Sequence, residues 1–126
     1  MLFKSEKGQA LVEFTLVLPI LLLLVFGVVE FGRIYSASLA VNHVARETAR
    51  AAVVGTNGTD LANVIKNAAP QLNYNQLNVT IAPATLVRGE EVTVDVEYTV
   101  NIQAPFINLI IPDPFLVRGT IVMRVE

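Results

Sequence analysis

The residue of this 126-residue chain whose type and position suggest chemistry most clearly is a carboxylate, Glu13, inside an apolar stretch. Residues 10–29 read ALVEFTLVLPILLLLVFGVV, and Glu13 is their one charged side chain. Such a carboxylate costs about 2.5–3.5 kcal/mol at the centre of a bilayer and less near its edge. Cleavage after Gly8 would create an α-amine at Gln9, and a neighbouring subunit's Glu13 could pair with that amine at low dielectric.

Each of these residues also has a simpler interpretation, which the sequence leaves open. Gly8 can be an ordinary glycine in the polar flank of a membrane segment, with no role in cleavage. Glu13 can reach water if it lies at the headgroup boundary. Glu30 and Arg33 are three residues apart at the other end of the apolar stretch. We expect them to form an interfacial ion pair worth a few tenths of a kcal/mol; docking of a partner is the alternative role.

The residues needed for catalysis, metal binding or cofactor binding are missing from the sequence. The chain has no Cys, and its one histidine, His43, has no second His, Ser or Asp at a telling spacing. The net charge is −2 and no run of Lys or Arg suits a phosphate backbone. We therefore expect no enzyme, no cofactor, no metal and no nucleic acid partner.

The element that must position Glu13 is a membrane helix. Twenty apolar helical residues span the roughly 30 Å hydrocarbon core, and residues 10–29 are too long an apolar run for a cleaved secretory signal. Lys4 and Lys7 precede the span and Arg33 follows it. Because the more basic flank stays in the cytoplasm, the N-terminus is expected inside and the remainder outside.

The helix is expected to continue well beyond the membrane. No Pro or Gly interrupts residues 35–54, so one helix over residues 9–54, about 70 Å long, is predicted, with a kink at Pro19. Helical spacing places Val41, Val44, Ala45, Thr48 and Ala52 on one face. Small residues allow close approach of other helices; here they are Ala37, Ala40, Ala45, Ala49 and Ala52.

The C-terminal half changes to a period of two. A short second helix is predicted from an N-cap at Asp60 to Pro70. Alternation then predicts three antiparallel strands with one wet face, around residues 77–81, 92–102 and 120–125, whose other face packs on helix. The apolar segment 103–116, QAPFINLIIPDPFL, is interrupted by three prolines. It is either a loop folded onto the domain or a contact surface for another subunit or the membrane.

The segment KGQALVEF, from Lys7 to Phe14, resembles the cleavage motif of type IV prepilins. More widely, residues 7–52 are similar to the TadE-like family of the tight-adherence (Flp) pilus system. The shared features are the opening GQALVEF, the Leu-Pro-rich span, the exit EFGR and the helix ARETARAA. Thr48 stands where that family usually has Ala.

This resemblance implies a minor pilin or pseudopilin of the tight-adherence (type IVb) pilus or a related secretion system, cut by a prepilin peptidase between Gly8 and Gln9, with Glu13 and Phe14 serving subunit assembly. The expected partners are that peptidase, other pilin-like subunits and membrane lipid. The alternative is an unprocessed single-pass membrane protein whose extracytoplasmic domain is a binding module.

The predicted architecture is α+β and pilin-like, with a long N-terminal transmembrane helix that extends into a small domain containing a second short helix and a three-stranded antiparallel sheet. Residues 1–8 would be the leader, 9–54 the long helix and 55–126 the extracytoplasmic domain. The expected location is the inner membrane of a bacterium, with a cytoplasmic N-terminus and a periplasmic or extracellular C-terminal domain.

Overall fold

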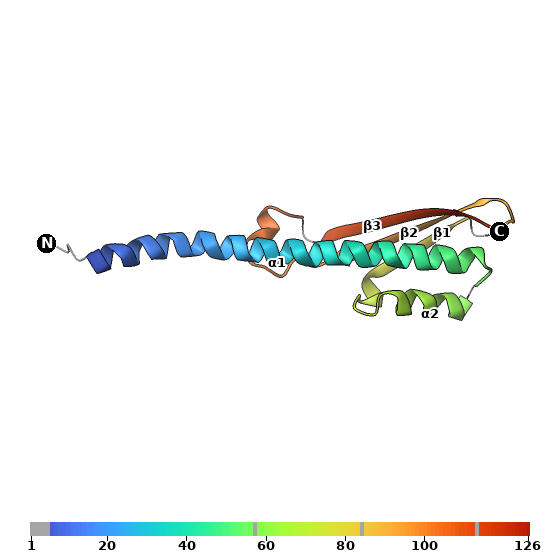
Figure 1. Cartoon of the computed structure of the whole chain (residues 1–126), viewed down its shortest axis with the longest axis horizontal. Coiled ribbons are helices and arrows are strands. Elements are labelled where there is room, and N and C mark those ends of the chain that lie inside the picture. Colours follow the sequence, from blue (N-terminus) through green and yellow to red (C-terminus); the bar gives the residue numbers. More distant parts are fainter. Residues whose placement is uncertain (1–5, 57, 84, 113) are drawn as a thin grey trace.

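The computed structural model describes residues 6–56, 58–83, 85–112 and 114–126. One long helix, α1 (Glu6–Val53), projects from a small body that covers only its C-terminal half (Figure 1). The other elements follow in chain order: α2 (Gly58–Ala68), η1 (Tyr74–Gln76), β1 (Leu77–Ala82), β2 (Glu91–Val100), η2 (Ile107–Leu109) and β3 (Phe115–Arg124). This is the predicted α+β fold.

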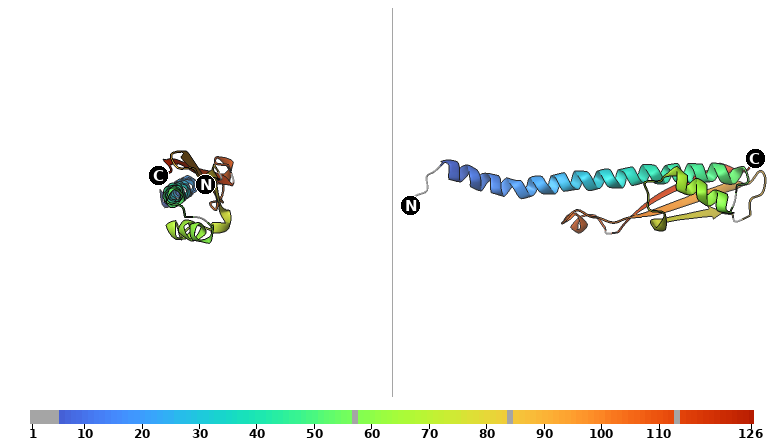
Figure 2. Two further views of the ribbon diagram at one scale, coloured as in Figure 1. Left: turned by 90° about the vertical axis from the view of Figure 1, so that its right-hand side faces the viewer. Right: turned by 90° about the horizontal axis from the view of Figure 1, so that it is seen from below.

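Helix α1 has 48 residues and is therefore about 72 Å long at 1.5 Å per residue. It begins three residues before the predicted start and ends one residue before the predicted end. The helix continues through Pro19, and Figure 2 shows a gentle bend in its N-terminal part rather than a break. Nothing in the described part of the chain buries its apolar window, and its length and composition suit a membrane crossing.

A glycine ends α1 and turns the chain into α2. Gly55 has a φ of 89°, a left-handed conformation that glycine adopts without steric cost, and its N–H donates to Ala52 O at 3.1 Å. The prediction that Asp60 caps α2 was wrong, because the helix already begins at Gly58. Asp60 instead lies in the first turn, where its charge complements the helix dipole.

The sheet has the order β1-β2-β3, with both strand pairs antiparallel. The predicted alternation of β2 is confirmed, since Val92, Val94 and Val96 are completely buried between more exposed neighbours. The predicted ends were wrong in two places. Strand β2 ends at Val100 rather than at residue 102, and β3 begins at Phe115, inside the segment predicted as a loop.

The core lies where α1 packs on β2 and β3, with α2 against the other side of α1 (Figures 1 and 2). The predicted buried face of α1 is confirmed: Val41, Val44, Ala45, Thr48 and Ala52 are at most 2% exposed. The alanines predicted to contact other helices are buried too. They therefore permit close packing within the subunit, and the prediction that they form its outer contact surface was wrong; they are Ala37, Ala40, Ala45, Ala49 and Ala52.

The closest approach of α1 and the sheet is at Gly119 of β3. A Cβ atom there would lie 3.0 Å from Asn42 Oδ1 and 3.1 Å from Val41 Cγ1. Asn42 is itself tied to the helix, because its Nδ2 donates to Ser38 O at 2.9 Å. The absence of a side chain at Gly119 therefore lets the middle of β3 lie directly on α1.

Candidate functional site

The predicted cleavage position lies within the first turn of α1. The helix begins at Glu6, so the peptide bond between Gly8 and Gln9 is helical, and both residues are exposed. Glycine is about 0.8–1.0 kcal/mol less favourable than alanine in a helix. The backbone of this turn is therefore easier to unwind than the apolar helix that follows.

Glu13 lies on the exposed surface of α1, one turn after Gln9. Gln9 Nε2 donates a hydrogen bond of 3.2 Å to Glu13 Oε1. The side chains around it are apolar and open: Leu11, Val12 and Phe14 are each at least 60% exposed. A carboxylate with no protein cover on an apolar helix is oriented toward whatever surrounds the helix, whether lipid or a second subunit.

Glu30 and Arg33 form an ion pair in a quite different environment. Arg33 Nη1 lies 2.8 Å and 2.9 Å from the two carboxylate oxygens of Glu30, which is only 2% exposed. The backbone N–H groups of Gln103 and Ala104 also donate to Glu30 Oε1, at 3.1 Å and 2.9 Å. This buried charge is compensated by one cation and two backbone donors, as a carboxylate inside a protein requires.

The segment after β2 is thereby held against α1. Both terminal nitrogens of Arg33 lie 3.5 Å from Asn101 O, and Ile107 of η2 is buried with its Cδ1 3.9 Å from the position of a Cβ on Gly27. Sequence reasoning singled out Glu30 and Arg33 but missed these backbone partners. The sequence offered one signal: the carboxylate of Glu30 at the end of an apolar helix, and the uncharged, apolar residues 101–112 far along the chain.

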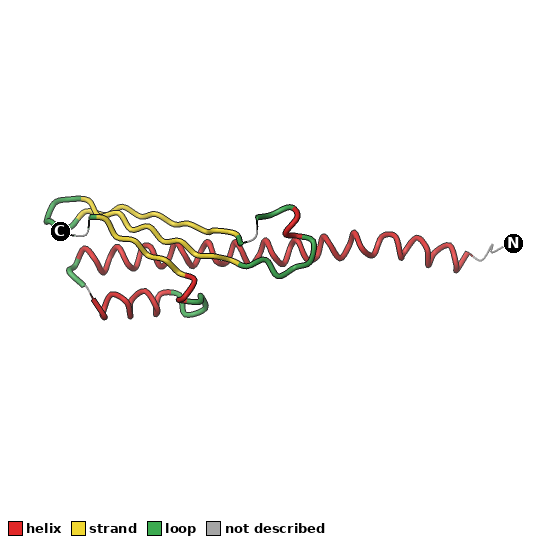
Figure 3. The backbone as a smooth tube through the Cα atoms, turned by 180° about the vertical axis from the view of Figure 1, so that it is seen from behind, coloured by secondary structure: helices red, strands yellow, loops and turns green. Residues whose placement is uncertain are grey.

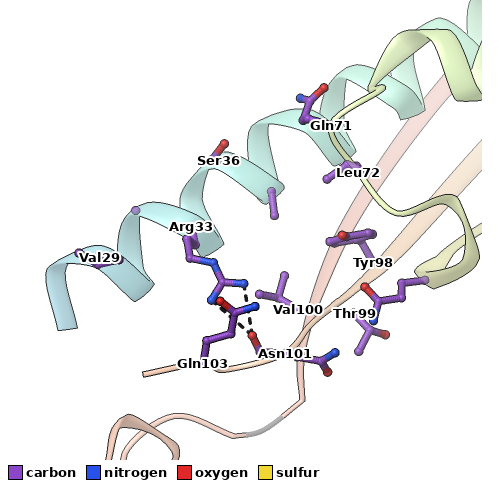
Figure 4. A pocket seen from close by; sticks show the side chains of 13 residues that line it. Val29, Arg33, Ser36, Gln71, Leu72, Tyr98, Thr99, Val100, Asn101 and Gln103 are labelled. Atoms are coloured by element: carbon purple, nitrogen blue, oxygen red, sulfur yellow. Dashed lines mark hydrogen bonds between the residues drawn. The ribbon is translucent and has the colours of Figure 1, made fainter. Parts of the chain in front are cut away.

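A cleft opens beside this ion pair, between α1, the end of β2 and the segment before η1 (Figure 4). Its volume is about 560 Å³. Arg33, Ser36, Tyr98, Thr99, Asn101 and Gln103 are among its lining residues, and Figure 4 shows Arg33 directed toward Asn101.

A second charge cluster lies on the sheet face opposite α1. The guanidinium of Arg118 binds Asp95, with Nε 2.9 Å from Oδ1, and Thr120 Oγ1 donates to the same oxygen at 3.1 Å. The hydrogen bond from Arg118 holds the pKa of Asp95 below its ordinary value of 3.8, although desolvation acts in the opposite direction. Glu97 lies 3.8 Å from Arg118 Nε. The solvent-exposed face predicted for β2 therefore carries the ion pairs of Asp95 and Glu97 with Arg118.

The described residues contain no group of three His, Cys, Asp or Glu side chains that could hold a metal ion. His43 is exposed on α1 between the buried residues of the core face. The chemical groups that the structure presents are suited to binding and packing.

The sequence model of a protein family described as TadE-like protein matches residues 8–50. The match covers most of α1 and contains Gly8, Glu13, Glu30 and Arg33. Comparison with curated proteins and with solved structures gave no match. TadE-like proteins are structural components associated with Tad pili. Over residues 8–50, most of an N-terminal helix that is long and apolar enough to cross a membrane once, the chain is therefore similar to TadE-like proteins.

Proposed function

We propose that this protein is a minor pilin or pseudopilin of a tight-adherence pilus. It would be stored in the bacterial inner membrane and would later pack against other pilin-like helices. The observation that carries the proposal is Glu13, an exposed carboxylate on an uncovered apolar helix whose residues 8–50 match the TadE-like family. Residues 1–8 would be the leader, residues 10–29 the membrane span, and residues 55–126, with the C-terminal half of α1, the domain outside the cytoplasm.

The proposed processing step hydrolyses the peptide bond between Gly8 and Gln9. A prepilin peptidase acting at the membrane surface would need this bond extended, and the glycine lowers the cost of unwinding the first turn of α1. Hydrolysis leaves a cationic α-amine on Gln9. The Glu13 of a neighbouring subunit would pair with it, with Phe14 packing beside the pair, in a setting where the attraction between the charges is weakly screened.

The experiment is the intact mass and N-terminal sequence of the protein from cells with and without their prepilin peptidase. We expect a chain that starts at Gln9 only when the peptidase is present. A Gly8→Val variant should remain uncut. Gly32→Val is the matched control on the same helix, because a Cβ at Gly32 meets nothing within 4 Å. A chain that begins at Met1 in both strains would remove the amine and contradict the proposal.

Glu13→Gln separates processing from assembly. The amide keeps the shape of the side chain and an acceptor for Gln9, but it removes the charge. We expect normal cleavage and loss of crosslinking to other pilin-like subunits. Without the Glu13 carboxylate, the α-amine of Gln9 is left unpaired at low dielectric, which costs about 3–5 kcal/mol and weakens subunit association more than a hundredfold. Glu47→Gln, farther along α1, should crosslink like the wild type.

An unprocessed, membrane-tethered binding module is the second candidate. The observation that favours it is the cleft of about 560 Å³ beside Arg33. Such a protein would keep residues 1–8 and would stay monomeric in the membrane. The same mass measurement and the crosslinking of the wild type therefore distinguish it from a pilin-like component.

A further inference from the structure

The segment after β2, residues 101–112, is held at a defined level along α1. It leaves the sheet and runs back beside the helix, beyond the ends of the strands (Figures 1 and 3). Glu30 accepts hydrogen bonds from two of its backbone N–H groups, and Ile107 is buried opposite Gly27. These contacts fix η2 beside residues 27–30 of α1.

That level coincides with the end of the apolar span. Gly27 precedes the C-terminal end of residues 10–29 by two positions, so Ile107 lies about 3 Å inside the end of the span at 1.5 Å per residue. Each polar headgroup layer of a bilayer adds several ångströms beyond its hydrocarbon core. If α1 crosses a membrane, η2 is therefore located where the hydrocarbon meets the headgroups.

The exposed side chains of residues 101–112 include three large apolar ones and no charged one. Phe106, Leu109 and Ile110 are 65%, 80% and 81% exposed, and no Lys, Arg, Asp or Glu occurs in residues 101–112. Phe106 adopts a φ of 67°, a left-handed conformation that is unfavourable for a bulky residue.

Part of the backbone of the segment is hydrogen-bonded within the chain. The N–H groups of Leu109, Ile110 and Ile111 donate to carbonyls of Phe106 and Ile107, at 2.9–3.2 Å. Together with the two bonds to Glu30, five backbone donors are satisfied inside the chain. Backbone groups that enter a membrane must be satisfied in this way, whereas a loop in water has no such need.

We infer that the η2 segment is a membrane-surface anchor, which inserts Phe106, Leu109 and Ile110 into the lipid leaflet nearest the β-sheet. The partner is phospholipid, because the contacts with Gly27 and Glu30 hold the segment at the level where α1, if it spans the membrane, leaves the hydrocarbon. Insertion at a second point would limit the tilt and rotation of the domain relative to the membrane. The inference rests on the part of the proposed function in which α1 spans the membrane.

The chain contains no Trp, so a single introduced tryptophan reports on one position of the full-length protein. The test variant is Ile110→Trp. Leu24→Trp, in the middle of the exposed apolar helix, is the reference inside the span, and Val122→Trp, 54% exposed on β3, is the reference on the domain. Each variant is reconstituted at low density into phosphatidylcholine vesicles and into matched vesicles of phosphatidylcholine brominated on its acyl chains.

We expect brominated lipid to quench Ile110→Trp and Leu24→Trp, with emission shifted to the blue and protection from acrylamide in water. Val122→Trp should be quenched by acrylamide and unaffected by bromine. If Ile110→Trp behaves like Val122→Trp while Leu24→Trp is quenched by bromine, the helix spans the membrane and the anchor is refuted. Protection of Ile110→Trp from both quenchers would mean that protein covers the segment, which also refutes lipid insertion.

Failure of the wider proposal gives a different pattern. If Leu24→Trp escapes quenching by brominated lipid, α1 does not cross the bilayer, and both the anchor and the membrane-stored pilin are wrong. Far-UV circular dichroism of each variant checks that the fold is retained. Because Ile110 is 81% exposed, the larger indole has room at that position.

Discussion

Two glutamates on the same helix show how the environment of a residue decides what its charge can do. Glu30 is buried and is fully engaged by Arg33 and two backbone N–H groups, so it stabilises the subunit itself. Glu13 is exposed on an apolar surface, where it accepts a hydrogen bond from Gln9. The first carboxylate is used inside the chain, and the second is available for interaction between chains.

Asp95 gives a prediction about pH. Its pKa is lowered in the folded state, so its contribution to stability is present above its ordinary value of 3.8 and is lost as the pH falls below 3.8 through the lowered pKa. Replacing its main partner, in Arg118→Gln, should raise the Asp95 pKa toward 3.8. Carboxyl carbon NMR in detergent micelles measures this titration directly. Arg124→Gln, on the same strand, should leave it unchanged, and an unchanged titration in Arg118→Gln would contradict the assignment.

The hydroxyl of Thr48 is predicted to lower the free energy of unfolding of the protein. Its Oγ1 is the buried side-chain polar atom that has no hydrogen-bond partner within the described residues. Thr48→Val removes the hydroxyl at nearly constant volume, so the free energy of unfolding should increase by about 1 kcal/mol. Denaturant titration in micelles measures the change. Thr120→Val removes a hydroxyl that does donate, to Asp95, and should give no such gain; equal effects in both variants would count against the explanation.

Between elements, the ion pair on α1 determines the position of η2. Glu30→Ala would leave the N–H groups of Gln103 and Ala104 without their acceptor. A hydrogen bond to a charged group contributes about 1.5–3 kcal/mol, so amide exchange at these two positions should accelerate at least about tenfold. Hydrogen exchange followed by mass spectrometry measures this rate. Glu47→Ala serves as the control, and unchanged exchange in Glu30→Ala would show that other contacts hold the segment.

The elements could be predicted from the sequence largely because each has a clear period. Uninterrupted apolar and small residues gave α1, and strict alternation gave β2 with its buried valines. The ends were less predictable, since Phe115 and Leu116 follow a proline and look like the apolar loop before them. They belong to β3 because β2 is long enough to pair with them, which is a property of the sheet and not of the local sequence.

At the scale of the whole molecule, α1 supplies both the candidate membrane span and one side of the hydrophobic core. Fully buried Val92, Val94 and Val96 pack in the same cluster as Val41 and Val44 of the helix. Burial of each such side chain contributes about 1.5–3 kcal/mol, and small domains have only about 5–15 kcal/mol in total. The sheet and α2 therefore depend on the C-terminal half of α1.

Two fragments test this dependence. Residues 30–126 retain Glu30 and the buried face of α1 and should fold as a soluble domain with cooperative thermal unfolding. Residues 55–126 lack that face and should be unfolded or aggregated. Circular dichroism and the dispersion of amide NMR signals measure both. Cooperative unfolding of the shorter fragment would show that α1 is only a tether.

The sequence by itself determined the long apolar helix, the α+β fold and the buried faces, because these depend on periodicity and composition along the chain. The tertiary structure decided which groups meet. Glu30 reaches backbone donors more than seventy residues away, and the alanines of α1 are buried within their own subunit. Periodicity identifies a buried face but not the element that covers it. Backbone N–H groups are the same in every residue except proline, so the sequence does not show which of them will bind Glu30. The partners of Glu30 and of the alanines therefore follow only from the folded structure.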